Sequence, residues 1–225
     1  MTAVFITATG TDIGKTFVTA GLIRHIRGAG GAVAAIKPIV SGFDPSAWQG
    51  SDPAMLLAAL GRPVALEEVE RISPWRFKAP LSPHMAGRRE GRLIVFQDVV
   101  EFCRRSMAGN RGVLLIEGVG GIMVPLEAKR TVLDWMAALN IPLLLVVGGY
   151  LGAISHTLTA LDVIAQRKLK IAAIVVSESE RGTVELHDTV DSIARFSNGI
   201  EVIGLPRLPG NIKEHPAFAQ IAALL

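Results

Sequence analysis

Apolar runs of strand length recur along the chain, and each is followed by glycine, proline or a polar residue. They lack the alternation of apolar and polar positions that marks a sheet with one face in water. Strands that are buried on both faces have this continuous pattern, which favours a parallel sheet covered by helices. The runs predict strands at residues 3–8, 32–37, 113–117, 142–147, 171–176 and 201–205.

The segments between these runs carry apolar residues at helical spacing. They predict helices at residues 16–27, 53–60, 95–107, 155–167, 183–196 and 217–224. This alternation defines the doubly wound α/β class, with a mostly parallel sheet, helices on both faces and ligands at the carboxyl ends of the strands. We expect one domain over residues 1–225, in which the irregular, proline-containing segment 43–92 forms a short helix and then substrate-shaping loops.

The sequence from Thr9 to Thr16, Thr-Gly-Thr-Asp-Ile-Gly-Lys-Thr, joins the first predicted strand to the first predicted helix. This arrangement holds a nucleoside triphosphate, because its glycines let backbone N–H groups turn toward the phosphates. Lys15 can place its charge on the terminal phosphates, and the Thr16 hydroxyl can ligate magnesium. Thr9 stands where the strict P-loop pattern has glycine. The dinucleotide pattern G-x-G-x-x-G fits less well, since three residues separate Gly10 from Gly14 and Lys-Thr follows.

Other polar or glycine-rich residues follow the remaining predicted strands. Because the carboxyl ends of parallel strands share one edge of the sheet, we expect them to face the same rim as the phosphate loop. They are Lys37, then Glu117-Gly118-Val119-Gly120-Gly121, Gly148-Gly149, Ser177-Glu178 and Leu205-Pro206-Arg207.

A phosphate-loop enzyme needs magnesium, which prefers hard oxygen ligands. Thr16 and Glu117 are the natural pair, with Glu117 in the place of a Walker-B acid. Asp52 and Asp12 are further candidates, although Asp52 is also a possible helix N-cap. Lys37 closes a buried strand, where a lysine either faces a ligand or extends to solvent. Two lysines, a metal ion and the loop amides would supply the charge stabilisation that phosphoryl transfer requires.

Composition limits the class of protein. Half of the residues are hydrophobic and 19% are charged, which is typical of a globular chain with a large core. The formal net charge of +3 is too small to indicate nucleic-acid binding. The single cysteine, Cys103, excludes an internal disulfide and is expected to be buried. The sequence has neither a signal-peptide pattern nor an apolar stretch of membrane-spanning length, which predicts a soluble cytoplasmic protein without membrane contact.

Taken together, the motifs resemble those of the ATP-dependent dethiobiotin synthetases. The resemblance spans most of the chain, and the Lys-Pro-x-x-Ser-Gly and Glu-Gly-x-Gly-Gly elements are specific. The matching pieces are Thr9 to Thr16, Lys37-Pro38-Ile39-Val40-Ser41-Gly42, Ser51-Asp52, Ser82-Pro83-His84, Glu90-Gly91-Arg92, Glu117 to Gly121, and Val147-Gly148 with Leu151 to His156.

This resemblance implies a P-loop NTPase fold and a ligase reaction in biotin biosynthesis. CO2 (or bicarbonate) and 7,8-diaminononanoate would form a carbamate, which the γ-phosphate of ATP activates as a carbamic-phosphoric anhydride. The neighbouring amine would then close the ureido ring and release phosphate. The family also implies Mg²⁺ as cofactor and a homodimer.

The resemblance assigns roles to individual positions. It implies a catalytic set of Lys37, Lys15, Thr11 and Ser41, and the magnesium ligands Thr16, Asp52 and Glu117. It implies that substrate contacts come from Thr11, Lys37 and Ser41, and from Gly149, Leu151, Gly152 and Ser155 of the second subunit. It implies nucleotide contacts from Asp12, Ile13, Gly14, Lys15, Thr16, Phe17, Asp52, Glu117, Gly118, Val119, Gly120, Ser177, Glu178, Leu205, Pro206 and Arg207. Ser177-Glu178 stands where the family typically has Asn-Asp, and Asp12 stands where it often has Glu.

Two other classes share this fold. A partitioning or cell-division ATPase switch carries a lysine four residues before the last glycine of its phosphate loop, where this chain has Gly10. A GTP-binding regulatory protein carries an Asn-Lys-x-Asp string, which is absent from the sequence. Because fold alone does not separate these classes, the residues at the rim favour the synthetase.

Overall fold

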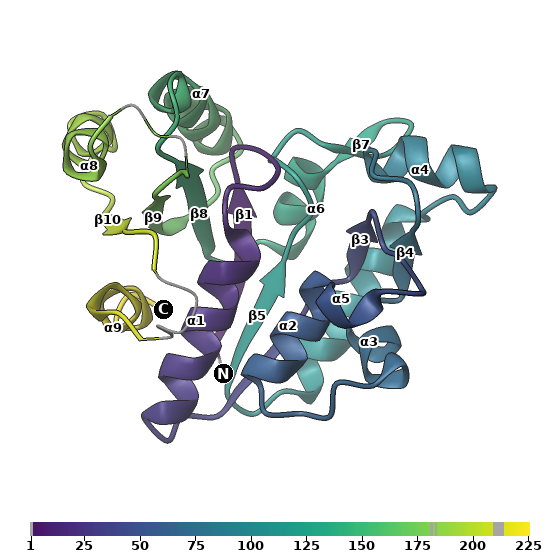
Figure 1. Cartoon of the computed structure of the whole chain (residues 1–225). Coiled ribbons are helices and arrows are strands. Elements are labelled where there is room, and N and C mark those ends of the chain that lie inside the picture. Colours follow the sequence, from purple (N-terminus) through teal and green to yellow (C-terminus); the bar gives the residue numbers. More distant parts are fainter. Residues whose placement is uncertain (1, 181, 183, 209–213) are drawn as a thin grey trace.

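A six-stranded parallel sheet forms the centre of the computed structural model, which describes residues 2–180, 182, 184–208 and 214–225 (Figure 1). The strand order is β10-β9-β8-β1-β5-β2. The strands are β1 (Thr2–Ala8), β2 (Val33–Ile36), β5 (Val113–Glu117), β8 (Leu143–Gly148), β9 (Ile171–Ser177) and β10 (Val202–Leu205). Every neighbouring pair in this sheet is parallel, so the carboxyl ends of all six strands share one edge.

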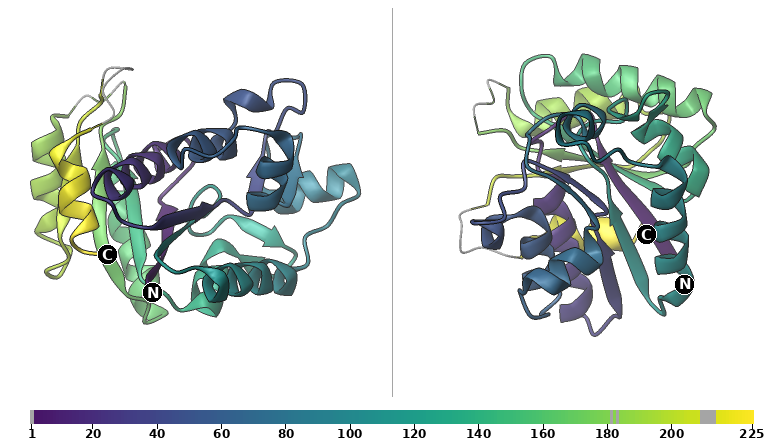
Figure 2. Two further views of the ribbon diagram at one scale, coloured as in Figure 1. Left: turned by 90° about the horizontal axis from the view of Figure 1, so that it is seen from below. Right: turned by 90° about the vertical axis from the view of Figure 1, so that its right-hand side faces the viewer.

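Helices cover both faces of the sheet. Figure 2 shows α1 and α5 on opposite sides of the strands, and α9 packs beside α1. The helices are α1 (Lys15–Gly28), α2 (Asp52–Ala59), α3 (Leu66–Ile72), α4 (Pro83–Glu90), α5 (Phe96–Gly109), α6 (Val132–Leu139), α7 (Ala153–Gln166), α8 (Leu186–Ala194) and α9 (Pro216–Ala222), with a short 3-10 turn, η1 (Trp48–Gly50). The predicted doubly wound α/β class is thus confirmed.

The core lies between the sheet and these helices. Phe5 of β1 and Trp135 of α6 are fully buried and meet edge to face, with ring centroids 4.8 Å apart. All of β8 is buried, which accounts for its unbroken apolar sequence. Cys103 is buried as predicted, and burial raises the pKa of its thiol to about 12. Among the residues that the structure describes, no helix is long and apolar enough to cross a membrane.

The segment 43–92 differs from the prediction. We expected loops after the first short helix, but two more helices, α3 and α4, follow it. Two short strands, β3 (Ile39–Ser41) and β4 (Trp75–Phe77), also pair in parallel outside the main sheet. Elements of three to eight residues are too short to give a clear hydrophobic period, so tertiary packing decides them.

Helix α6 was also missing from the prediction. It is preceded by a small antiparallel pair, β6 (Pro125–Glu127) and β7 (Arg130–Thr131). Thr131 and Asp134 form a reciprocal capping box at its start. The Thr-x-x-Asp spacing was therefore an available signal. The predicted helix at 183–196 is shorter in the structure and begins at Leu186; Thr183 lies outside the described residues.

A close contact between α1 and α9 gives the first prediction. A Cβ atom built on Gly21 would lie 2.1 Å from the buried ring of Phe218. Although alanine ordinarily stabilises a helix relative to glycine by about 1 kcal/mol, we expect Gly21→Ala to lower the free energy of unfolding by about 1–2 kcal/mol through overpacking. Urea denaturation measures this. In a Phe218→Ala background the same change should be neutral or stabilising; an equal loss in both backgrounds would refute the explanation.

Candidate active site

The loop after β1 turns sharply into α1. Asp12 and Gly14 have left-handed backbone angles, with φ of 57° and 96°, and Gly14 is the N-cap residue of α1. A Cβ atom on Gly14 would lie 2.7 Å from the hydroxyl oxygen of Ser177. Both the backbone angle and this contact favour glycine at position 14. The loop therefore presents the N-terminus of α1, a favourable place for anions, at the rim of the sheet.

Lys15 lies buried beneath this loop. Its ammonium group donates a hydrogen bond to the carbonyl oxygen of Gly10 at 3.0 Å. Burial lowers the pKa of Lys15 to about 8, and the nearby charge of Lys37 acts in the same direction. An anion placed at the loop would favour the charged form of Lys15.

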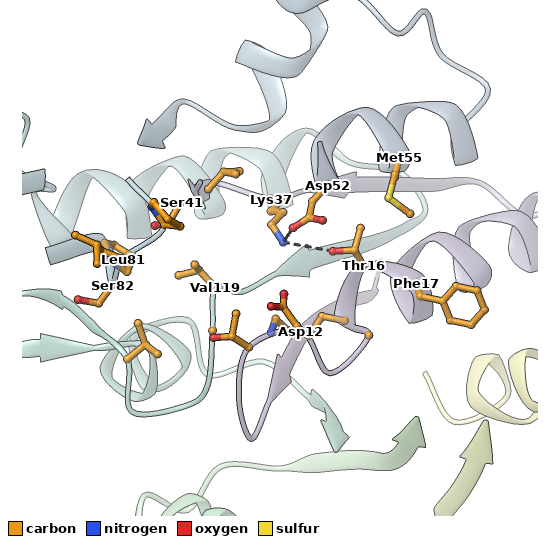
Figure 3. Close-up of a pocket in the computed structure, with 18 residues that line it drawn as sticks. Asp12, Thr16, Phe17, Lys37, Ser41, Asp52, Met55, Leu81, Ser82 and Val119 are labelled. Carbon is orange, nitrogen blue, oxygen red and sulfur yellow. Dashed lines mark hydrogen bonds and ion pairs between the residues drawn. The ribbon is translucent and has the colours of Figure 1, made fainter. Parts of the chain in front are cut away.

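A second cationic group, Lys37, lies at the same edge of the sheet. It directly follows β2, which pairs with β5, so it comes beside Glu117 at the end of β5. The Lys37 ammonium lies 2.5 Å from Glu117 Oε1 and 2.6 Å from Asp52 Oδ2. It also lies 3.4 Å from the hydroxyl oxygen of Thr16, which itself donates to Glu117 Oε1 at 2.6 Å. Thr16 of α1, Asp52 of α2 and Glu117 of β5 thus surround the ammonium group of Lys37. Figure 3 shows its contacts with Asp52 and Thr16.

The electrostatics of this cluster follow from burial. Burial by itself lowers the pKa of Lys37, but the charges of Glu117 and Asp52 outweigh it and raise that pKa. Burial also opposes ionisation of Asp52, yet Lys37 holds the pKa of this carboxyl below its ordinary value. Glu117 is fully buried, and its second oxygen, Oε2, has no hydrogen-bond partner among the described residues. A buried carboxylate with a free lone pair retains the capacity to bind a further donor or a cation.

The alternative role of Asp52 as a helix N-cap is wrong. Ser51 occupies the N-cap position of α2, and Asp52 is the first helical residue. Its carboxylate points to Lys37 rather than to the backbone N–H groups of the helix (Figure 3). Asp52 therefore belongs to the cluster at the sheet edge.

A cavity of about 820 Å³ opens over the cluster. Figure 3 shows two ends: Ser41, Leu81 and Ser82 gather at one, and Phe17 and Met55 lie at the other, with Lys37 between them. The cavity is lined by Thr11, Asp12, Gly14, Lys15, Thr16, Phe17, Lys37, Val40, Ser41, Asp52, Met55, Pro80, Leu81, Ser82, Pro83, Val119, Gly120 and Val124. The hydroxyl of Ser41 is buried and has no hydrogen-bond partner among the described residues, so it is available to a ligand.

A second cavity, of about 540 Å³, continues on the other side of the phosphate loop. Asp12, Gly14, Phe17 and Met55 line both cavities. The second is also lined by Ile13, Ala20, Arg24, Ser177, Glu178, Ser179, Glu180, Pro206, Arg207 and Leu208. Glu178 Oε2 accepts the backbone N–H of Arg207 at 2.7 Å, so the segments after β9 and β10 are joined.

Seven of the sequence-predicted residues line neither of these cavities. One of them, Glu117, is fully buried and contacts Lys37. Gly118 packs against Phe5, and Leu205 is buried in β10. The other four lie at the start of α7, where Leu151 is 84% exposed. They are Gly149, Leu151, Gly152 and Ser155.

Several residues that line the cavities had no predicted role. Val40, Met55, Leu81 and Val124 carry no chemical signature, and only the fold brings them to the cavity. Arg24 lines the second cavity from about two and a half turns beyond the first residue of α1. For Ser82, the Ser-Pro-His string was an available signal.

The fold and the site together define a P-loop nucleotide-binding protein. A family model described as an AAA domain matches residues 2–214. The MinD cell division protein of Aquifex aeolicus is similar in fold, with a TM-score of 0.55 and 16% identity over 100% of this chain and 95% of that chain. The MinC:MinD complex from the same organism gives a TM-score of 0.56 at 15% identity, covering 100% of this chain and 94% of that chain.

Sequence similarity identifies the family of the chain more specifically than the fold does. An ATP-dependent dethiobiotin synthetase of Acidiphilium cryptum is 48% identical over 87% of this chain and 88% of its own length. One of Caulobacter vibrioides is 47% identical over 92% of this chain and 93% of its own. One of Legionella pneumophila is 36% identical over 84% of this chain and 86% of its own. The chain belongs to the family of ATP-dependent dethiobiotin synthetases.

The buried cluster gives a prediction about stability. Lys37→Met should lower the free energy of unfolding by about 3 kcal/mol, because it leaves Glu117 without its cationic partner in the core. Urea denaturation at neutral pH measures the loss. The double variant Lys37→Met/Glu117→Gln also removes the unpaired charge of Glu117, so it should recover part of the lost free energy of unfolding. A double variant no more stable than Lys37→Met would contradict this account of the pair.

Proposed function

We propose that the chain closes the ureido ring of dethiobiotin from 7,8-diaminononanoate, CO2 and ATP, in the biosynthesis of biotin. The observation that carries the proposal is Lys37 at the middle of one cavity, with the phosphate loop on one side and Ser41 on the other. This arrangement suits a reaction that brings a triphosphate and a carboxylated amine together.

The first step joins an amine nitrogen of the substrate to the carbon of CO2, with loss of a proton, and gives a carbamate anion. The Ser41 hydroxyl, which has no hydrogen-bond partner within the described part of the chain, can donate to a carbamate oxygen, and Thr11 lines the same cavity. Lys37 would hold the negative charge of the carbamate near the phosphates.

In the second step a carbamate oxygen attacks the γ-phosphorus of ATP, and ADP leaves. Lys15 would stabilise the charge on the β- and γ-phosphate oxygens, together with the loop amides. The neighbouring amine then attacks the carbonyl carbon and loses a proton, the bond between that carbon and the phosphate oxygen breaks, and the ring closes with release of inorganic phosphate. The protein forms no covalent bond to the substrate in this sequence, so its contribution is position and charge.

The donor set at the sheet edge fits Mg²⁺. Thr16, Asp52 and Glu117 offer hard oxygen atoms. Oε2 of buried Glu117, which has no hydrogen-bond partner among the described residues, is suited to a cation. Within the described part of the chain there is no group of three or more His, Cys, Asp or Glu side chains that could hold a metal. Two carboxylates and a hydroxyl suffice for Mg²⁺, which keeps water and phosphate oxygens as its other ligands. The ion would neutralise charge on the triphosphate.

The second cavity is the proposed site of the nucleobase. Ser177, Glu178, Pro206 and Arg207 line it beside the phosphate loop. They are positions to which the resemblance assigns base contacts, with Ser177-Glu178 in place of the typical Asn-Asp. Of the sequence-predicted nucleotide contacts, Ile13 and Phe17 line it as well.

We also propose a cytoplasmic homodimer. Gly149, Leu151, Gly152 and Ser155 lie outside the cavity that holds the other substrate contacts of the same chain. The start of α7 would complete the site of a second copy, where a helix N-terminus suits the substrate carboxylate. The proposed partners are small molecules, without nucleic acid or membrane.

The experiment that tests the function is mass detection of dethiobiotin from purified protein, 7,8-diaminononanoate, bicarbonate and MgATP. We expect phosphate release to require the diamine and bicarbonate together. Turnover that is independent of both, or that DNA or lipid vesicles stimulate, would favour an ATPase switch, the second class with this fold.

Lys15 gives a prediction about catalysis. Lys15→Ala should reduce the rate of dethiobiotin formation by at least about a hundredfold, the scale of losing one preorganised charge partner of the transition state. Steady-state kinetics measures this, with Lys170→Ala as a matched control because Lys170 is exposed and far from the loop in the sequence. A rate close to that of the unmodified protein in Lys15→Ala would remove Lys15 from the mechanism.

A further inference from the structure

Glu90 is the last residue of α4 and is half-buried. A carboxylate at this position faces the negative end of the helix dipole, which is unfavourable. Among the described residues no lysine, arginine or histidine forms an ion pair with it. Instead, Glu90 Oε1 accepts the backbone N–H of Ala79 at 2.9 Å. The carboxylate of Glu90 therefore binds the backbone of a segment outside α4.

Ala79 lies at the start of the loop that lines the main cavity. Its carbonyl oxygen accepts the backbone N–H of Gly42 at 3.2 Å and that of Leu81 at 2.9 Å. Gly42 has φ of 75°, and Pro80 would contact any Cβ atom placed there at 3.5 Å. Through Ala79, the end of α4 is therefore linked to the turn that follows Ser41.

The linked segments form one end of the cavity. Ser41 of β3 pairs with Phe77 of β4, and Phe43 donates its N–H to the carbonyl oxygen of Phe77 at 2.8 Å. Ser41, Leu81 and Ser82 gather at this end, away from Phe17 and Met55 (Figure 3).

We propose that Glu90 is a positioning residue for the diamine substrate. It fixes Ala79, and Ala79 fixes both the 80–83 loop and the turn after Ser41. Glu90 does not line the cavity itself, so it acts through these backbone groups. The proposal rests on the function proposed above, in which this end of the cavity receives the diamine and the other end receives ATP.

Three variants test it. Glu90→Ala removes the acceptor, whereas Glu90→Gln keeps an oxygen that can accept from Ala79. Glu67→Ala is the control for loss of one negative charge, because Glu67 is exposed and forms no hydrogen bond or ion pair with the described residues. We measure KM for diamine and for ATP separately, and hydrogen exchange of the segment 79–83.

For Glu90→Ala we expect a rise of about tenfold in KM for the diamine, the scale of one hydrogen bond to a charged group. We expect KM for ATP to change less than about twofold, because that end of the cavity is built from other residues. Exchange of the Ala79 amide should become faster. Glu90→Gln and Glu67→Ala should stay close to the unmodified protein in all three measurements.

Two results for Glu90→Ala itself would overturn the proposal: an unchanged diamine KM, or an equal rise of both KM values, which indicates a general loss of structure. Glu90→Gln as impaired as Glu90→Ala would also overturn it. If the unmodified protein makes no dethiobiotin, the proposed function fails instead. The exchange measurement still decides whether Glu90 anchors Ala79.

Discussion

The geometry of the site depends on the ammonium group of Lys37 and the two carboxylates that enclose it. Glu117 is fully buried, and such a charge is stable in the core only with a partner at hydrogen-bond distance. The parallel pairing of β2 with β5 sets these residues side by side. Asp52 brings the start of α2 to the same point. One ionic cluster therefore joins the sheet, the phosphate loop and the segment that follows β3.

The Lys37 cluster lies between two regions of the connected cavities. On one side the phosphate loop and the second cavity suit a nucleotide, since amide groups and Lys15 favour anions there. On the other side Ser41 and the 80–83 loop form a wall with a free hydroxyl. Because Lys37 lies between these regions, a single charge can act on both reactants.

Some residues of the site can be predicted from local sequence patterns, and others cannot. The Thr9–Thr16 loop, Lys37 and Glu117 each follow or end a strand, and parallel strands place such positions at one edge whatever their separation in sequence. Their convergence could be expected before any coordinates. By contrast, Leu81 and Met55 lie in segments without a clear period, and nothing in their own sequence directs them to the cavity. The hydrogen bond between Glu90 and Ala79 likewise could not be predicted from the local sequence.

Periodicity and loop chemistry in the sequence determined the α/β class, the positions of the six strands of the main sheet to within a residue or two, and the gathering of Thr16, Lys37 and Glu117. These follow from local backbone preferences and strand direction. Tertiary structure alone decided that Asp52 pairs with Lys37 instead of capping its helix, that segment 43–92 contains α3 and α4 after its first helix, and that Gly149 to Ser155 lie outside the cavity. These outcomes depend on contacts between distant segments, whose free energies exceed the small local preferences that a sequence pattern records.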